Sequence, residues 1–77
     1  MHEIAILRSI VETISEHAQG DAVTRVHLVI GMQSGVSPEA LEFSFGIATR
    51  DTVLDGAELT VTVSPGRQLL IDSIEVA

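Results

Sequence analysis

The clearest periodic pattern lies near the start of the chain. Apolar residues recur there at alternating spacings of three and four, at Ile4, Leu7, Val11, Ile14 and Ala18, with Ile10 widening the stripe. This spacing puts them on one face of an α-helix over residues 4–18. Gly20 predicts a left-handed end of that helix. His17 falls in the last turn, where positive charge is favoured by the helix dipole, so we interpret it as a capping residue rather than a metal ligand.

A period of two follows over residues 25–30 and predicts a strand with one face in the core. The inward set is Val26, Leu28 and Ile30. His27 falls on the more polar face, which favours a solvated sheet residue over a ligand. The loop at 31–35 carries glycines, but it lacks the lysine and the spacing of a phosphate-binding loop. Nucleotide binding is therefore not expected there.

A second helix is predicted to begin at residues 37–39 and to run to about Thr49. The Ser-Pro-Glu start supplies a capping hydroxyl, a proline at the first helical position and an acid in the first turn. Its apolar stripe consists of Leu41, Phe45 and Ala48. We expect both phenylalanines, Phe43 and Phe45, in the core. We also expect close packing at Gly46, because glycine inside a helix costs up to about 1 kcal/mol against alanine.

Two further strands are predicted after a turn at Asp55-Gly56. Residues 58–63 alternate cleanly between apolar and polar positions, and residues 69–76 form the last strand. In that strand Leu70, Ile74 and Val76 are expected to share one face, with Asp72 as the odd member. The link at 64–68 is short, so we expect the two strands to form an antiparallel hairpin.

The predicted order is helix, strand, helix, strand, strand. It corresponds to a two-layer α+β domain (α-β-α-β-β) over residues 1–77, with two helices on one face of a three-stranded mixed sheet. Both amphipathic stripes would then be buried. The other sheet face is expected to stay solvated, and it would carry Arg25, His27, Glu58, Thr60 and Thr62.

Charge and composition narrow the function. The 77 residues have a net charge of −7, with four arginines and no lysine, which disfavours nucleic acid as a partner. The absence of cysteine excludes disulfides and thiolate metal sites. No apolar run is long enough to span a membrane and no basic leader precedes one, so a cytoplasmic location is expected. So small a domain has limited buried surface, which leaves homo-oligomerisation open.

Catalytic groups do not gather in the sequence, and an enzyme is not expected. The carboxylates are scattered over polar helix faces and turns, and the serines have no histidine and acid companions at a recognisable spacing. Three binding classes remain: a metal-handling module, a protein-interaction module, or a regulatory fragment of a larger protein.

The first three residues, Met1-His2-Glu3, contain a set of nitrogen donors that could bind a metal ion. A free α-amine, the backbone nitrogen of His2 and its imidazole can close two adjacent chelate rings. Nitrogen donors in a plane suit Ni(II) or Cu(II). The alternative is that Met1 is only the initiator and His2 an exposed side chain, since three-residue motifs also match by chance.

Several stretches, in chain order, resemble one known family. They are Met1-His2-Glu3, residues 26–31, 34–41 and 54–57, and the final 73–76. With these the chain resembles the HypA/HybF family of nickel-insertion accessory proteins in the maturation of nickel–iron hydrogenase. The resemblance covers most of the chain.

The resemblance implies a nickel site at the N-terminus. His2 would be the principal side-chain ligand, the Met1 amine and the backbone nitrogen of His2 would complete the chelate, and Glu3 would be a secondary candidate. Members of the family also carry a zinc-binding insertion with two C-x-x-C pairs between the last two strands. Here residues 64–68 stand in that place, so no structural zinc is expected.

The resemblance also implies partners and a role. These are a HypB-type GTPase, the hydrogenase large subunit, and delivery of Ni(II) by a non-enzymatic metallochaperone. Urease is a possible recipient by family analogy only. The alternatives are an interaction scaffold of the same fold with little or no metal role, and a chelator of copper or other divalent ions, because Cu(II) competes well for the same nitrogens.

Overall fold

The first helix forms where the apolar stripe predicts it. In the computed structural model, which describes residues 3–77, helix α1 spans Glu3–Ala18. The stripe is buried at Leu7, Ile10, Val11, Ile14 and Ala18. Gln19 and Gly20 take positive φ angles of 51° and 91°, which ends the helix as Gly20 predicted.

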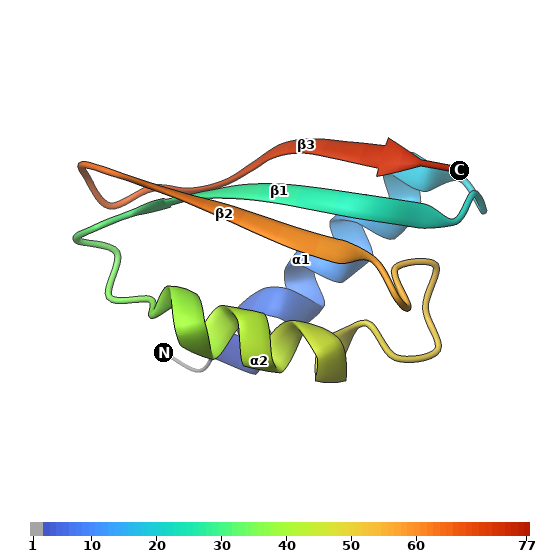
Figure 1. Cartoon of the computed structure of the whole chain (residues 1–77), viewed down its shortest axis with the longest axis horizontal. Helices are drawn as coiled ribbons and strands as arrows, with labels where there is room; N and C mark the ends of the chain where they lie inside the picture. Colours follow the sequence, from blue (N-terminus) through green and yellow to red (C-terminus); the bar gives the residue numbers. More distant parts are fainter. Residues whose placement is uncertain (1–2) are drawn as a thin grey trace.

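A three-stranded sheet covers both helices on one side. Its strands are β1 (Val23–Gly31), β2 (Glu58–Ser64) and β3 (Leu69–Val76), and the second helix is α2 (Pro38–Ala48). The strand order is β2-β1-β3, with β1 parallel to β2 and antiparallel to β3. Figure 1 shows α1 and α2 on the same side of the sheet, so the predicted two-layer α+β architecture is confirmed.

The N-terminus of α2 is held by the cap that the sequence predicts. Ser37 has an extended backbone, and its hydroxyl accepts a 3.3 Å hydrogen bond from the Ala40 N–H. Pro38 occupies the first turn, where a missing N–H has no consequence. At the other end, the buried Thr49 donates its hydroxyl to the Phe45 carbonyl at 2.8 Å.

Removing this cap gives a first prediction. Ser37→Ala should lower the free energy of unfolding by about 1 kcal/mol, because the Ala40 N–H loses its acceptor. Ser37→Asp should keep most of that stability, since a carboxylate caps as well as a hydroxyl does. Urea denaturation followed by circular dichroism measures both variants. Equal destabilisation by alanine and aspartate would mean that the hydroxyl has another role.

Only one of the two phenylalanines belongs to the core. Phe45 is 5% exposed and packs with Leu41 and Leu54, whereas Phe43 is 76% exposed. The expectation that both are buried is wrong, because Phe43 and Ile47 lie on the face of α2 turned away from Leu41 and Phe45. The expectation of close packing at Gly46 is also wrong: a Cβ built there meets nothing within 4 Å.

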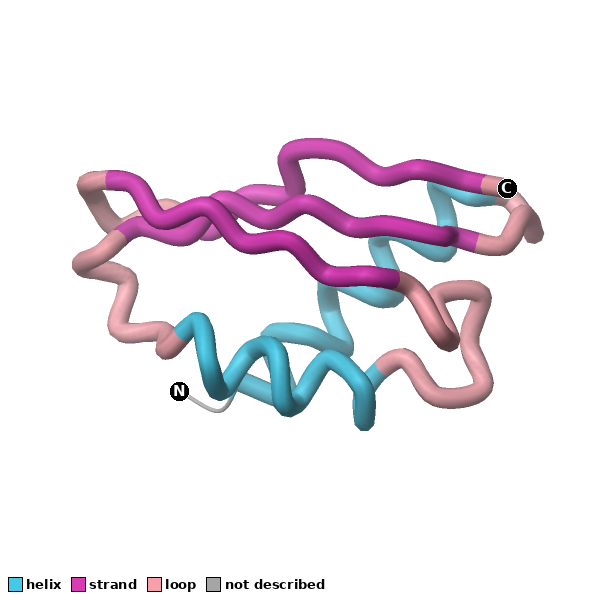
Figure 2. The backbone as a smooth tube through the Cα atoms, viewed as in Figure 1, coloured by secondary structure: helices cyan, strands magenta, loops and turns pink. Residues whose placement is uncertain are grey.

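The expected hairpin of the last two strands is wrong as well. Both strands pair with β1, and the link at 65–68 crosses the end of β1 to reach the opposite edge of the sheet (Figure 2). Four residues can span up to about 13 Å, which suffices to step across one intervening strand. The central position gives β1, the strand with the most buried apolar residues, a hydrogen-bonded partner on each side.

The last strand presents different residues to the core than predicted. A register shift between His27 and Leu28 marks a β-bulge, which places two residues of β3 opposite one of β1. Ile74 pairs with Val26 but Ile71 pairs with Leu28, so Ile71 and Ile74 both lie on the inner face. Leu70, expected on the same face as Ile74, is instead 53% exposed.

Candidate functional site

The predicted metal site lies at the start of α1, and the structure describes only its last residue. Glu3 is half-buried and begins the helix, while Met1 and His2 lie outside the described residues. Within residues 3–77, no three histidine or carboxylate side chains come close enough together to hold a metal ion. The geometry of the predicted chelate is therefore not tested, and the assignment stays a prediction.

The other histidines are too far from Glu3 to contribute to such a site. His17 stands in the last turn of α1, about 21 Å from Glu3 along the helix axis. Its Nδ1 lies 3.0 Å from the Thr13 carbonyl oxygen, one turn earlier. His27 contacts Asp72 and Thr62 on the face of β1 opposite to the buried Val26 and Leu28, so it does not face α1. A chelate at the terminus must take its nitrogens locally.

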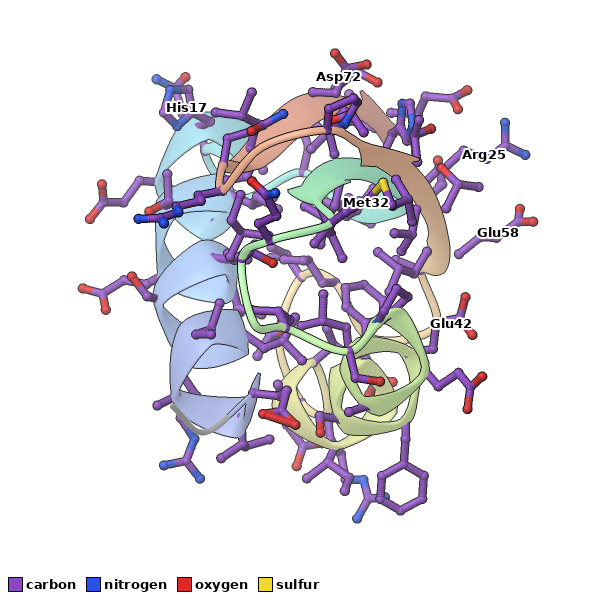
Figure 3. The ribbon with its side chains drawn as sticks, turned by 90° about the vertical axis from the view of Figure 1, so that its left-hand side faces the viewer. His17, Arg25, Met32, Glu42, Glu58 and Asp72 are labelled. Carbon is purple, nitrogen blue, oxygen red and sulfur yellow. The ribbon has the colours of Figure 1, made fainter. Side chains whose placement is uncertain are left out.

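Helix α2 packs against α1 and carries the exposed carboxylate of Glu42. Figure 3 shows Glu42 directed away from α1, on the far side of α2. It is therefore not placed to bind a metal at the start of α1.

A cluster of charged side chains covers the open face of the sheet. Arg25 on the central strand donates to Glu58 on β2 at 3.1 Å and to Glu75 on β3 at 3.0 Å. The pKa of the guanidinium is raised, first by its hydrogen bond to Glu58 and then by the negative charge of Glu75. Figure 3 shows Arg25 and Glu58 projecting from the same side of the sheet. The arginine thus bridges all three strands at solvent-exposed positions.

Two residues further along β1, His27 bridges the same three strands. Its Nδ1 lies 3.0 Å from an Asp72 carboxylate oxygen, and its Nε2 lies 2.7 Å from the Thr62 hydroxyl. The bulge in β3 turns Asp72 toward this face. An acid, an imidazole and a hydroxyl in line form a proton relay in many enzymes. Here the hydroxyl belongs to an exposed threonine on an open sheet face, and we interpret the arrangement as a link between strands.

The sequence predicted only part of these two clusters. Arg25 and His27 were predicted on the solvated face together with Glu58 and Thr62, and the structure confirms that placement. The partners on β3, Asp72 and Glu75, were missed. Finding them needed the strand order and the bulge, neither of which alternation in the sequence reveals.

Comparison with known proteins identifies the family. A family model described as "Hydrogenase/urease nickel incorporation, metallochaperone, hypA" matches residues 1–69. The hydrogenase maturation factor HypA of Geobacter metallireducens is 49% identical over 67 residues, covering 87% of this chain and 61% of that protein. The HypA of Nostoc punctiforme is 47% identical over 66 residues, covering 86% of this chain and 58% of that protein. The chain thus spans about three-fifths of the length of these relatives.

The fold agrees with that of a solved relative. The solution structure of the Ni metallochaperone HypA from Helicobacter pylori superimposes with a TM-score of 0.73, covering 100% of this chain and 87% of that one. At 14% identity, this likeness speaks for the fold alone. The family match, by contrast, extends over most of the sequence and includes the Met-His-Glu start. The chain belongs to the HypA family of hydrogenase maturation factors and nickel metallochaperones.

Proposed function

We propose that this chain binds one Ni(II) ion at its N-terminus and passes it on during hydrogenase maturation, without catalysing a reaction itself. The observation that carries the proposal is the family match over residues 1–69, which begins at the Met-His-Glu motif. Family membership supports nickel as the cargo in preference to copper. The acidic chain, with a net charge of −7, also attracts cations.

The start of α1 suits a chelate that uses backbone nitrogen. The first N–H groups of an α-helix have no carbonyl partner within the helix. A metal can therefore replace the amide proton of His2 without breaking a hydrogen bond of α1, which begins at Glu3. The Met1 amine, the His2 amide nitrogen and the His2 imidazole supply three donors, and Glu3 is the nearest carboxylate to complete the set.

In this proposal the chain receives Ni(II) from a HypB-type GTPase and passes it to the hydrogenase large subunit. We place the exchange in the cytoplasm. Within residues 3–77, no helix is long and apolar enough to cross a membrane. A structural zinc is not expected, since the chain has no cysteine and residues 64–68 stand where the family's zinc-binding insertion would be.

A second candidate function is an interaction scaffold of the same fold with little metal role. The observation that favours it is the short link at 64–68, which stands where the family's zinc-binding insertion would be. A metal-transfer function that needs that insertion would not be carried out by this domain, whereas its interaction surfaces do not depend on it.

Blocking the terminal amine separates the two candidates. Calorimetric titration with Ni(II) should give one tight site for a chain whose Met1 amine is free. A two-residue extension ahead of Met1 should weaken binding at least about tenfold, because the amine becomes a non-basic amide and one chelate ring is lost. Equal affinity with and without the extension would contradict the terminal chelate, and no binding by either chain would favour the scaffold.

A further inference from the structure

The outer side of α2 carries two large apolar side chains that the domain does not bury. Phe43 is 76% exposed and Ile47, one helical turn later, is 50% exposed. Figure 1 shows α1 and the sheet on one side of α2, and within residues 3–77 no element covers the opposite side. Two such neighbours, one of them aromatic, mark this side of the helix as a candidate contact surface.

A gap in the same helix face lies beside these side chains. Gly46 is exposed, follows Phe43 by three positions and precedes Ile47. Its φ angle is not positive, and nothing lies within 4 Å of a Cβ built there. Glycine costs a helix about 0.5–1 kcal/mol relative to alanine, and neither the backbone nor packing inside the domain requires it here. A gap of this kind can receive a large side chain from a second helix.

Opposite charges stand at the two ends of this face. Glu39 lies in the first turn of α2, four positions before Phe43, and Arg50 lies three positions after Ile47. Thr49 keeps a helical backbone conformation, so Arg50 continues the same face. The two charges are about 16 Å apart along the helix axis, too far to pair within one chain. Neither makes an ion pair within residues 3–77.

We propose that a second copy of the chain covers this face, with the two α2 helices antiparallel about a two-fold axis. Centring the pair between Phe43 and Gly46 places Phe43 of each copy opposite the gap at Gly46 of the other. The same register places Glu39 of each copy opposite Arg50 of the other. The face is thus complementary to itself in both shape and charge, and a two-fold interface makes each of these contacts twice.

The contact is small, so the dimer is expected to be weak. One face of an 11-residue helix buries less than the roughly 1,200 Å² of total surface at which stable interfaces begin. The net charge of −7 on each copy also opposes association. We expect a monomer–dimer equilibrium that is visible only at high micromolar concentrations. The surface includes none of Met1, His2 and Glu3, so it does not depend on the proposed nickel chelate.

Exchanging the charges tests the register on the metal-free chain. Glu39→Arg and Arg50→Glu each put like charges opposite one another, so sedimentation equilibrium should show self-association weakened about fivefold for each. An equimolar mixture of the two variants should associate about as strongly as the native chain, because the changed positions then meet with opposite charge. If net charge alone decided, Glu39→Arg, which is less negative, would associate best. That result, or a mixture no stronger than its components, would overturn the proposal.

Filling the gap tests the packing. Gly46→Leu should leave the domain folded, because the site has free space and leucine is a better helix former than glycine. It should weaken self-association about tenfold, since the new side chain occupies the place of Phe43 from the other copy. Unspecific apolar adhesion would instead increase with the added leucine, and that outcome would overturn the proposal. Leu70→Ser is the control, because Leu70 is 53% exposed on β3 and should not affect association.

Dilution of the native chain places the contact. The ¹⁵N–¹H correlation spectra should change with concentration at α2 and its flanking residues, with Gly46 and Ile47 among the most shifted. Changes confined to α1 and β3 would put the self-contact on another surface and overturn the proposal. A chain that stays monomeric up to millimolar concentration would also overturn it, and would leave this face to a different protein. Absence of nickel binding by a chain that still dimerises would refute the proposed function alone.

Discussion

Replacing His2 with alanine should abolish stoichiometric nickel binding while the domain stays folded. Loss of a group that merely orients a metal ligand costs 10–100-fold in affinity, so loss of the imidazole itself should exceed about 100-fold. His2 precedes α1 in the sequence, and the buried core of the described residues is formed between Leu7 and Leu54. Calorimetry with Ni(II) measures the affinity, and far-ultraviolet circular dichroism checks the fold.

The matched control for this variant is His17→Ala. His17 stands about 21 Å from Glu3 along α1, so its imidazole cannot reach a metal held at the terminus of the same chain. Its removal should leave nickel affinity unchanged. If His17→Ala weakens nickel binding as much as His2→Ala does, the metal is held between two chains or at another site, and the terminal assignment fails.

Nickel affinity measured in the same titration should decrease as pH falls. An amine and an imidazole must both give up protons before they bind a metal, so binding releases protons and weakens as pH falls. Proton release measured in buffers of different ionisation enthalpy distinguishes this from a metal held only by carboxylates.

Much of the fold could be predicted because the apolar pattern is regular where the core is regular. The stripe of α1 and the inward set of β1, Val26, Leu28 and Ile30, are buried as expected. These elements use one face each, so periodicity alone identifies them. The capping signal at Ser37 is equally local and is confirmed by its hydrogen bond to Ala40.

The errors arise where a residue's environment is set by partners distant in sequence. The predicted hairpin is wrong because a link of this length can reach either an adjacent strand or the next strand but one. Both β2 and β3 pair with β1, so β1 lies between them. The prediction of which residues share a face of β3 is wrong because a bulge beside Leu28 shifts the alternation of its side chains. The prediction that Phe43 is buried is wrong because only one side of α2 is covered by the rest of the protein.

The candidate site shows the same division between local and distant information. The proposed chelation by Met1-His2-Glu3 could be inferred from adjacent residues alone, whereas a fourth donor would depend on residues distant in sequence. The bridges made by Arg25 and His27 depend on the register of three strands. The exposed face of α2 could not have been predicted, since it follows from which side of that helix the core covers.

A single methyl group added beneath the link at 65–68 should lower the free energy of unfolding strongly. Gly31 ends β1 directly beneath the link, and a Cβ there would overlap the Gly66 carbonyl group and lie 2.8 Å from the Arg67 nitrogen. All of these are backbone atoms, which cannot swing aside as a long side chain can. Gly31→Ala should therefore push the link away from the sheet.

Three backbone hydrogen bonds depend on that close approach. The N–H groups of Gly31, Met32 and Gln33 donate to carbonyls at 68, 64 and 66, at 2.7, 2.7 and 2.8 Å. Overpacking costs about 1–3 kcal/mol or more, and each lost hydrogen bond adds about 0.5–1.5 kcal/mol. A chain of this length has a stability of roughly 4–12 kcal/mol. Gly31→Ala should thus remove a large part of it.

Gly46→Ala is the matched substitution with the opposite sign. Nothing lies within 4 Å of a Cβ at Gly46, and alanine in a helix is favoured by about 0.5–1 kcal/mol over glycine. Urea denaturation should therefore show the Gly46 variant slightly above the native chain and the Gly31 variant well below it. A native-like midpoint for Gly31→Ala would mean that the link is not held against β1.

Nickel binding by the Gly31 variant distinguishes a loss of fold stability from a loss of metal ligands. The proposed donors belong to three consecutive residues ahead of and at the start of α1, and the backbone hydrogen bonds that hold the link involve residues 31–33 instead. At a temperature where Gly31→Ala remains folded, its nickel affinity should match that of the native chain, whereas His2→Ala should be stable but unable to bind. If the Gly31 variant loses nickel while folded, the link contributes to the metal site. The missing donor should then be sought at the Leu69 end of β3, which lies next to both the link and the first turns of α1.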